Sequence, residues 1–178
     1  MDEHGATLQI GDRSLELPAV PAHQGNSGVD ISKLRAAEGI VTFDPGFANT
    51  ASAQSTITYI DGTAGKLTHR GYAIEELANS CSFLEVAYLL LFGHLPNKNQ
   101  LEQWQDSMKR HSLLNEELKR FFNAFPKRAH PMSILSSATN AISTFYEEYH
   151  DPQDEEAIVQ SAQRLLAKMP TVAAWSYK

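Results

Sequence analysis

The pattern of apolar and polar positions divides the chain into an extended front part and a helical remainder. Before Tyr72, apolar residues alternate with polar ones in short runs, which is the period of β-strands. After Tyr72, apolar residues recur at spacings of three or four, which is the period of an α-helix. We therefore predict a mainly α protein with a small N-terminal β element. Residues 1–71 are expected to form hairpins and connectors, and residues 72–178 a helical domain.

Two β-hairpins are predicted in the front part. Thr7 to Pro18 alternates apolar and polar residues on both sides of a glycine-led turn at Gly11. Ile57 to His69 repeats the pattern as two short strands around a second glycine turn. Beside that hairpin, His69 and Arg70 could take an anion-binding or acid–base role. Alternatively, Arg70 ties the turn together through hydrogen bonds to carbonyl groups.

Capping residues mark the first two long helices. Ser82 with Glu85 fits a capping box at the start of FLEVAYLLLF, and a glycine follows the last residue of that run. Asn97 with Gln100 repeats this logic before a helix over Leu101 to Arg110. Because the first of these helices is apolar on nearly every side, we expect it to be buried in a larger assembly.

Further helices are predicted toward the end of the chain. One begins near Asn115 and ends near Pro126, and another opens at Pro131 and has a small, polar second face. A turn at Asp151 and Pro152 precedes a helix over Glu155 to Met169. Pro170 is then expected to open one more helix, which the chain barely begins. From this ending we expect a truncated protein.

Composition limits the class of protein. The chain has 178 residues, of which 42% are hydrophobic and 20% charged, enough to bury the core of an ordinary domain. No apolar run is long enough to cross a membrane, and the first residues are acidic rather than basic. We therefore expect a cytoplasmic protein. The single cysteine, Cys81, excludes an internal disulfide and a cysteine-based zinc cluster, and it is expected to be a small core residue.

Charge argues against nucleic acid as a partner, because the net charge is −6. The distribution is uneven, however. Between Lys109 and Arg128, six cationic residues stand against Glu116 and Glu117, which gives this segment a net charge of +4 and leaves −10 for the rest. A small anion could be attracted there. Charge alone favours a solvated helix face with pairs such as Glu116 with Lys119.

Candidate chemistry is limited to cationic residues. The sequence has no glycine-rich phosphate loop and no HExxH or GxSxG motif, so it predicts neither a catalytic residue nor a metal site. Arg164 and Lys168 are four positions apart on one predicted helix and share a face, where a phosphate could lie between them. Tyr146 is available for stacking or hydrogen bonding. His111, which follows Arg110, is either a ligand contact or a structural residue.

Six segments of the chain resemble, in order and spacing, the N-terminal part of the citrate synthase family, in its bacterial, Gram-negative type. They are VTFDPGFANTAS, ITYIDGTAGKLTHRGYAIEEL, FLEVAYLLLFGHLP, RHSLLNEELKRFFNAFP, HPMSILSSATNAISTFY and RLLAKMPTVAAWSYK. The resemblance implies a citrate synthase-like helical fold, here truncated. It also implies an enzyme of the tricarboxylic acid cycle that condenses acetyl-CoA with oxaloacetate to give citrate and CoA. Such an enzyme requires no cofactor and works as a homodimer or as a hexamer of dimers.

The resemblance also implies where the sites lie. The family's catalytic carboxylate and histidines belong to its C-terminal part, so no catalytic residue is assigned here and the chain alone is expected to be inactive. Gram-negative members are inhibited by NADH at an allosteric site, and five positions of this chain match that site: Arg110, His111, Tyr146, Arg164 and Lys168. Ser112 and Leu113 depart from the family pattern, which commonly has threonine and methionine.

Two alternatives to this interpretation stay open. The chain could belong to a 2-methylcitrate synthase, which uses propionyl-CoA, because the residues that select the acyl group are expected outside this segment. It could also be a non-catalytic helical interaction module. Such a module would use the apolar helix at Phe83 to Phe92 and the small-residue face after Met132 to bind a partner.

Overall fold

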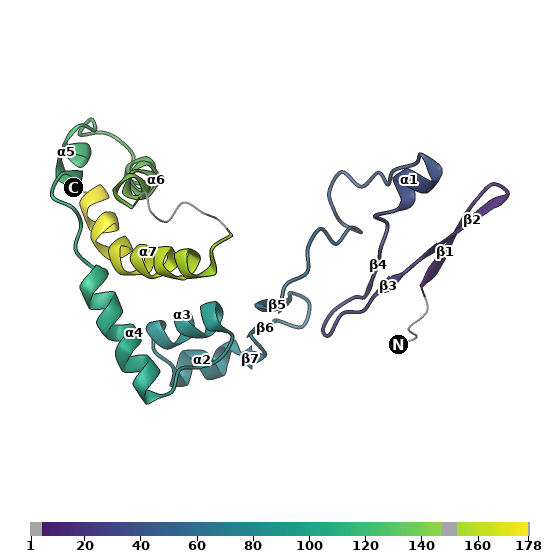
Figure 1. Ribbon diagram of the computed structural model, residues 1–178, viewed down its shortest axis with the longest axis horizontal. Helices are drawn as coiled ribbons and strands as arrows, with labels where there is room; N and C mark the ends of the chain where they lie inside the picture. Colours follow the sequence, from purple (N-terminus) through teal and green to yellow (C-terminus); the bar gives the residue numbers. More distant parts are fainter. Residues whose placement is uncertain (1–4, 147–152, 178) are drawn as a thin grey trace. The chain divides into compact units, whose positions relative to one another are not determined.

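The computed structural model describes residues 5–146 and 153–177. The chain divides into two compact units, Met1–Ser80 and Cys81–Lys178 (Figure 1). The first unit contains all the described strands and two short helices, whereas the second is built from helices. The predicted mainly α fold with small sheets at the front is therefore confirmed. Helix α2 (Ile74–Ser80) falls in the first unit with the strands that precede it.

The first predicted hairpin is present. Strands β1 (Ala6–Ile10) and β2 (Arg13–Leu17) pair antiparallel, with Leu8 opposite Leu15. The turn between them places Gly11 at φ 61°, a left-handed conformation that glycine adopts without steric cost. The hairpin predicted from the alternation and its glycine turn are therefore confirmed.

The second predicted hairpin is also present, as strands β5 (Thr58–Asp61) and β6 (Lys66–His69), and it gains a third short strand, β7 (Tyr72–Ala73). Nδ1 of His69 makes a 2.9 Å hydrogen bond with Oγ1 of Thr58 across the strands. Arg70, at φ 50°, donates from its guanidinium group to Oγ1 of Thr56 at 2.9 Å and to the Thr56 carbonyl at 3.4 Å. Both side chains therefore make structural contacts beside the turn, as the second of the two interpretations of Arg70 expected.

Three elements of the first unit were not predicted. Strands β3 (Ala19–Val20) and β4 (Gly28–Val29) pair antiparallel, and a short helix, α1 (Leu34–Glu38), follows them. Two-residue strands are too short to show a period in the sequence. Helix α1 ends at Gly39, which adopts a left-handed conformation with φ 68°.

In the second unit, both predicted capping boxes are confirmed. Helix α3 (Phe83–Phe92) begins at Ser82, whose hydroxyl accepts from the backbone of Glu85 while the Glu85 carboxylate accepts from the backbone of Ser82. Helix α4 (Lys98–His111) begins with the same reciprocal pair between Asn97 and Gln100. Each pair satisfies amide groups that a helix start leaves open.

Helices α3 and α4 pack through aromatic residues. The ring of Trp104 lies edge-on to Tyr88, with 5.6 Å between ring centres, and edge-on to Phe92 at 5.7 Å. Trp104 is almost fully buried and Leu89 of α3 is completely buried, whereas Phe83 at the start of α3 is 72% exposed. The apolar helix α3 is thus buried within this unit on one side, and the first turn keeps an exposed aromatic ring.

The remaining helices form a second cluster of buried side chains. They are α5 (Leu118–Asn123), α6 (Pro131–Ile142), the 3₁₀ turn η1 (Ser143–Phe145) and α7 (Glu155–Ser176). Helices α6 and α7 pack against each other, and Figure 1 shows α6 end-on beside α7. The buried core of this cluster consists of Leu118, Ala138, Ile142 and Val172. His130 caps the start of α6, because its Nδ1 accepts a hydrogen bond from the amide of Met132.

The prediction of a new helix at Pro170 is wrong. Helix α7 continues through Pro170, which lies in its interior. A proline there removes one backbone hydrogen bond and crowds the preceding turn. Packing offsets this cost, because Lys168 before the proline and Val172 after it are both buried on the same helix. The turn predicted at Asp151 and Pro152 lies outside the described residues.

Within the described ranges 5–146 and 153–177, no helix is long and apolar enough to span a bilayer.

Candidate functional site

Three segments of the second unit bring the five cationic and aromatic candidate residues together. The end of α4 supplies Arg110 and His111, the residue after η1 is Tyr146, and the middle of α7 supplies Arg164 and Lys168. We call these five residues the cationic cluster. Because Arg164 and Lys168 are one helical turn apart, both face the same region, as their spacing predicted.

Tyr146 is the aromatic centre of the cationic cluster. The guanidinium carbon of Arg164 lies 4.2 Å from the centre of the Tyr146 ring, and the ammonium nitrogen of Lys168 lies 5.7 Å from it. Both distances are within the range of cation–π attraction. Tyr146 and Arg164 are both half-buried, and both lie in the wall of the adjoining groove.

Lys168 is the buried member of the cationic cluster, with 4% of its surface exposed. Its ammonium group donates to the carbonyl oxygen of His111 at 2.7 Å and to that of Leu113 at 2.6 Å. His111 is the last residue of α4, where carbonyl groups lack helical partners and the helix dipole is negative. Lys168 therefore caps the end of α4 from α7. No local pattern of residues predicts these contacts, because they join positions more than 50 residues apart.

The surroundings of His111 favour its neutral form and lower its pKa. Burial is the main cause that lowers the pKa of His111 below its ordinary value of 6.5. The positive charges of Arg164, Lys168 and Arg110 lower this pKa further, in that order. Arg110 itself is exposed. All three cations are thus close enough to act on one imidazole, which is the electrostatic condition for an anion site.

A groove of about 720 Å³ adjoins the cationic cluster between α6 and α7. Arg164 and Tyr146 lie in its wall together with small polar side chains of α6, among them Ser136 and Asn140. The small residues predicted along one face of α6 therefore leave space beside α7. The groove gives a ligand bound at Arg164 room to extend along the two helices.

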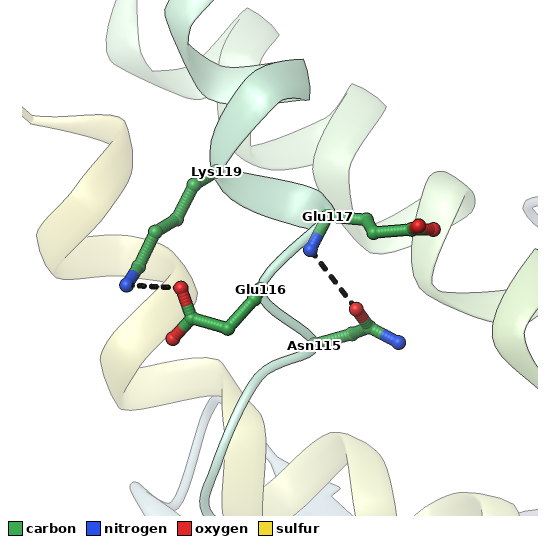
Figure 2. Close-up of polar contacts among 4 residues, drawn as sticks. All are labelled: Asn115, Glu116, Glu117 and Lys119. Carbon is green, nitrogen blue, oxygen red and sulfur yellow. Dashed lines mark hydrogen bonds and ion pairs between the residues drawn. The ribbon is translucent and has the colours of Figure 1, made fainter.

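The wider basic segment is partly neutralised by its own acidic neighbours. Lys119 forms an ion pair with Glu116, as the sequence predicted, and Asn115 accepts a hydrogen bond from the amide of Glu117 at the start of α5 (Figure 2). Lys109 pairs with Asp106 at 3.2 Å. These exposed pairs match the solvated helix face that charge alone favoured. Lys109 and Lys119 are therefore poorer candidates for an anion contact than the cationic cluster.

In the described part of the chain, no three His, Cys, Asp or Glu side chains come together in a way that could hold a metal ion. Cys81 is half-buried at the start of the second unit. The cationic and aromatic side chains of the cationic cluster are suited to binding an anion.

Solved structures of similar fold are citrate synthases. That of Pyrobaculum aerophilum superposes with a TM-score of 0.67 at 27% identity, over 99% of this chain and 39% of its own. That of Thermotoga maritima gives a TM-score of 0.63 at 29% identity, over 76% of this chain and 34% of its own. The helical fold is therefore of the citrate synthase class.

Comparisons of the amino-acid sequence indicate the same family as the comparison of folds. The family model described as "Citrate synthase, C-terminal domain" matches residues 46–178. Citrate synthase 1 of Mycobacterium tuberculosis is 50% identical over 173 residues, which cover 97% of this chain and 40% of that protein. Citrate synthase of Corynebacterium glutamicum is 42% identical over 177 residues, which cover 99% of this chain and 40% of that protein. The chain belongs to the citrate synthase family, and it spans 40% of the length of these relatives.

Proposed function

We propose that this chain is the N-terminal part of a citrate synthase, the enzyme that condenses acetyl-CoA with oxaloacetate and releases citrate and CoA. The observation on which this rests is the 50% identity to Citrate synthase 1 of Mycobacterium tuberculosis over nearly the whole chain. In the proposed enzyme, the described part of the chain supplies helical scaffold and an anion site, and the catalytic groups lie in the remaining part. The active protein is a homodimer or a hexamer of dimers.

The N-terminal placement and the Gram-negative type rest on the order and the residues of the six segments that resemble the family. The matching family model is described as the C-terminal domain, and neither relative's name specifies a type. The DNA sequence beyond the codon for Lys178 tests the placement directly. An in-frame continuation rich in histidine and arginine supports it, and a stop codon contradicts it.

We further propose that the cationic cluster binds the phosphates of NADH as an allosteric inhibitor. Arg164 and His111 approach each other beside Tyr146, Arg110 adds an exposed charge, and the adjoining groove offers space for the rest of a dinucleotide. Guanidinium groups grip phosphate oxygens in pairs, and an aromatic face can stack on a planar ring. The cluster contains no acidic side chain among its five members, so a bound phosphate would meet no direct repulsion from them.

The catalytic proposal is tested by thiol release. The intact protein that contains this chain should release CoA from acetyl-CoA when oxaloacetate is added, and the 178-residue chain alone should release none above a no-protein control. A parallel assay with propionyl-CoA distinguishes a 2-methylcitrate synthase. Release by the 178-residue chain alone would contradict the assignment of the catalytic groups to the remaining part.

A further inference from the structure

Lys168 differs from the other cations of the cationic cluster in its burial and in its hydrogen bonds. It is almost fully buried, whereas Arg164 is half-buried and Arg110 exposed. Two of the three hydrogens on its ammonium group are directed at the carbonyls of His111 and Leu113, at 2.7 and 2.6 Å. A phosphate ligand needs a cation that can turn its donors toward the ligand. Lys168 has already directed most of its donors to the backbone.

These hydrogen bonds act on the segment that holds Arg110 and His111. Lys168 lies on α7, and its acceptors are the last residue of α4 and a residue of the following loop. The carbonyl of Lys109, two residues before His111, accepts a hydrogen bond from the Ser112 hydroxyl at 2.8 Å. Lys168 donates to the carbonyls of His111 and Leu113 in the same stretch. Lys168 binds the carbonyl of His111. The imidazole of the same residue lies close enough to Arg164 and Arg110 for their charges to lower its pKa.

A second hydrogen bond joins α4 to α7 at the same contact between the two helices. The hydroxyl of Ser107, one turn before His111, donates to the side-chain carbonyl of Gln163 at 3.3 Å. Met108 and Trp104 of α4 pack against Leu166 and Ala167 of α7. The body of α4 is therefore held by apolar packing, and its end is held by the Lys168 ammonium group.

We propose that Lys168 is a positioning residue for the anion site: it fixes the end of α4, and with it His111 and Arg110, at the correct place relative to Arg164. It does so through hydrogen bonds to the two carbonyls rather than by contact with phosphate. This inference rests on the proposed NADH site for its effect on binding. The contact between α7 and α4 stands on the geometry alone.

Two substitutions separate hydrogen bonding from charge. Lys168→Gln keeps two N–H donors, on a side chain that is one bond shorter, and removes the charge, while Lys168→Met removes both the donors and the charge. In the intact protein, Lys168→Met should weaken NADH binding about tenfold or more, and Lys168→Gln about threefold or less. Lys109→Gln, which removes one exposed charge from the same turn of α4, is the matched control and should leave the affinity unchanged. Equal losses in Lys168→Gln and Lys168→Met would overturn the proposal.

Hydrogen exchange of the free protein, followed by mass spectrometry, gives a measurement that does not depend on NADH. Lys168→Met should speed exchange over residues 109–116 while leaving α6 unchanged, and Lys168→Gln should stay close to the wild-type rate. If wild-type protein does not bind NADH, the regulatory proposal fails, and a local effect seen only in Lys168→Met still supports the positioning of α4. Equal exchange in all three proteins would overturn that positioning.

A third comparison covers the case in which Lys168→Met does not fold. Lys168→Gln and Arg164→Gln each remove one positive charge from α7. If Lys168 acts by position, Lys168→Gln should keep most of the NADH affinity while Arg164→Gln loses about tenfold or more. Equal losses in these two variants would show that Lys168 acts as a charge on the ligand.

Discussion

The guanidinium carbon of Arg164 lies 4.2 Å from the centre of the Tyr146 ring, which joins helix α7 to the end of η1. This contact places a cation and an aromatic face together in the wall of the groove between α6 and α7. Such a pair can hold a phosphate on one side and a planar group on the other.

Arg164→Ala should weaken NADH binding to the intact protein about ten- to hundredfold, because it removes the half-buried guanidinium group of the cluster. Fluorescence or calorimetric titration measures the dissociation constant. Arg120→Ala removes an exposed cation from α5 and should leave it unchanged. An unaltered affinity in Arg164→Ala would argue against the assignment of NADH to this site.

The ring of Tyr146 should matter more than its hydroxyl group. Tyr146→Phe keeps the face on which Arg164 lies and should bind NADH as the wild type does, whereas Tyr146→Leu should lose about threefold or more in affinity. Titration of both variants under identical salt conditions makes the comparison. A loss in Tyr146→Phe as large as that in Tyr146→Leu would show instead that the hydroxyl group bonds the ligand.

Anion binding should strengthen as pH falls. The pKa of His111 lies below 6.5 because of burial and of the neighbouring Arg164, Lys168 and Arg110 charges. A bound phosphate favours the protonated imidazole and raises this pKa, so binding takes up a proton. NADH affinity should therefore increase as the pH falls from the pKa of His111 in the complex toward its lower pKa in the free protein. His111→Gln should flatten this dependence, and a variant that keeps the full pH dependence would exclude His111 as its source.

The same lowered pKa of His111 makes the free energy of unfolding decrease as pH falls, whereas NADH affinity is expected to increase. Unfolded His111 takes up its proton near pH 6.5, before the folded form does, so the unfolded state binds more protons in the window between the two pKa values. The stabilising contribution of neutral His111 is therefore present above pH 6.5 and is lost as pH falls through the folded pKa. His111→Gln should remove this dependence from the pH profile of unfolding.

Ser82→Ala should destabilise the second unit by about 1 kcal/mol, because it removes the cap at the start of α3. The Ser82 hydroxyl and amide both bond the Glu85 carboxylate, at 2.6 and 2.7 Å, and lower the pKa of Glu85 below its ordinary value. Chemical denaturation measures the change in the free energy of unfolding. Ser136→Ala, at an exposed position inside α6, is the control and should cost nothing. Equal stability of Ser82→Ala and wild type would mean that the cap does not stabilise α3.

Leu89→Ala should cost about 2–5 kcal/mol, because Leu89 is completely buried on α3 and its removal leaves a cavity. Leu113→Ala, at a side chain that is 80% exposed, should stay within about 0.5 kcal/mol of the wild type. Thermal or chemical unfolding of the pair measures this difference. Similar small effects in both variants would show that α3 is not part of the folding core.

Local features of the fold were predictable because they depend on residues close in sequence. The capping boxes at Ser82 and Asn97 need a partner only three positions away, and the hairpin at Gly11 needs only alternation and a turn. The error at Pro170 has the opposite origin. Proline usually ends a helix, and only the packing of buried side chains on both sides of it keeps α7 continuous.

For the candidate site, the sequence by itself determined which side chains are cationic or aromatic and that Arg164 and Lys168 share one helix face. Its motifs also identified the family, which the comparisons then showed. Only the tertiary structure decided that α7 packs against α4, so that Lys168 bonds the carbonyls of His111 and Leu113 while Arg164 lies on Tyr146. These contacts join segments far apart in the chain. Their geometry depends on helix packing, which no local pattern of residues encodes.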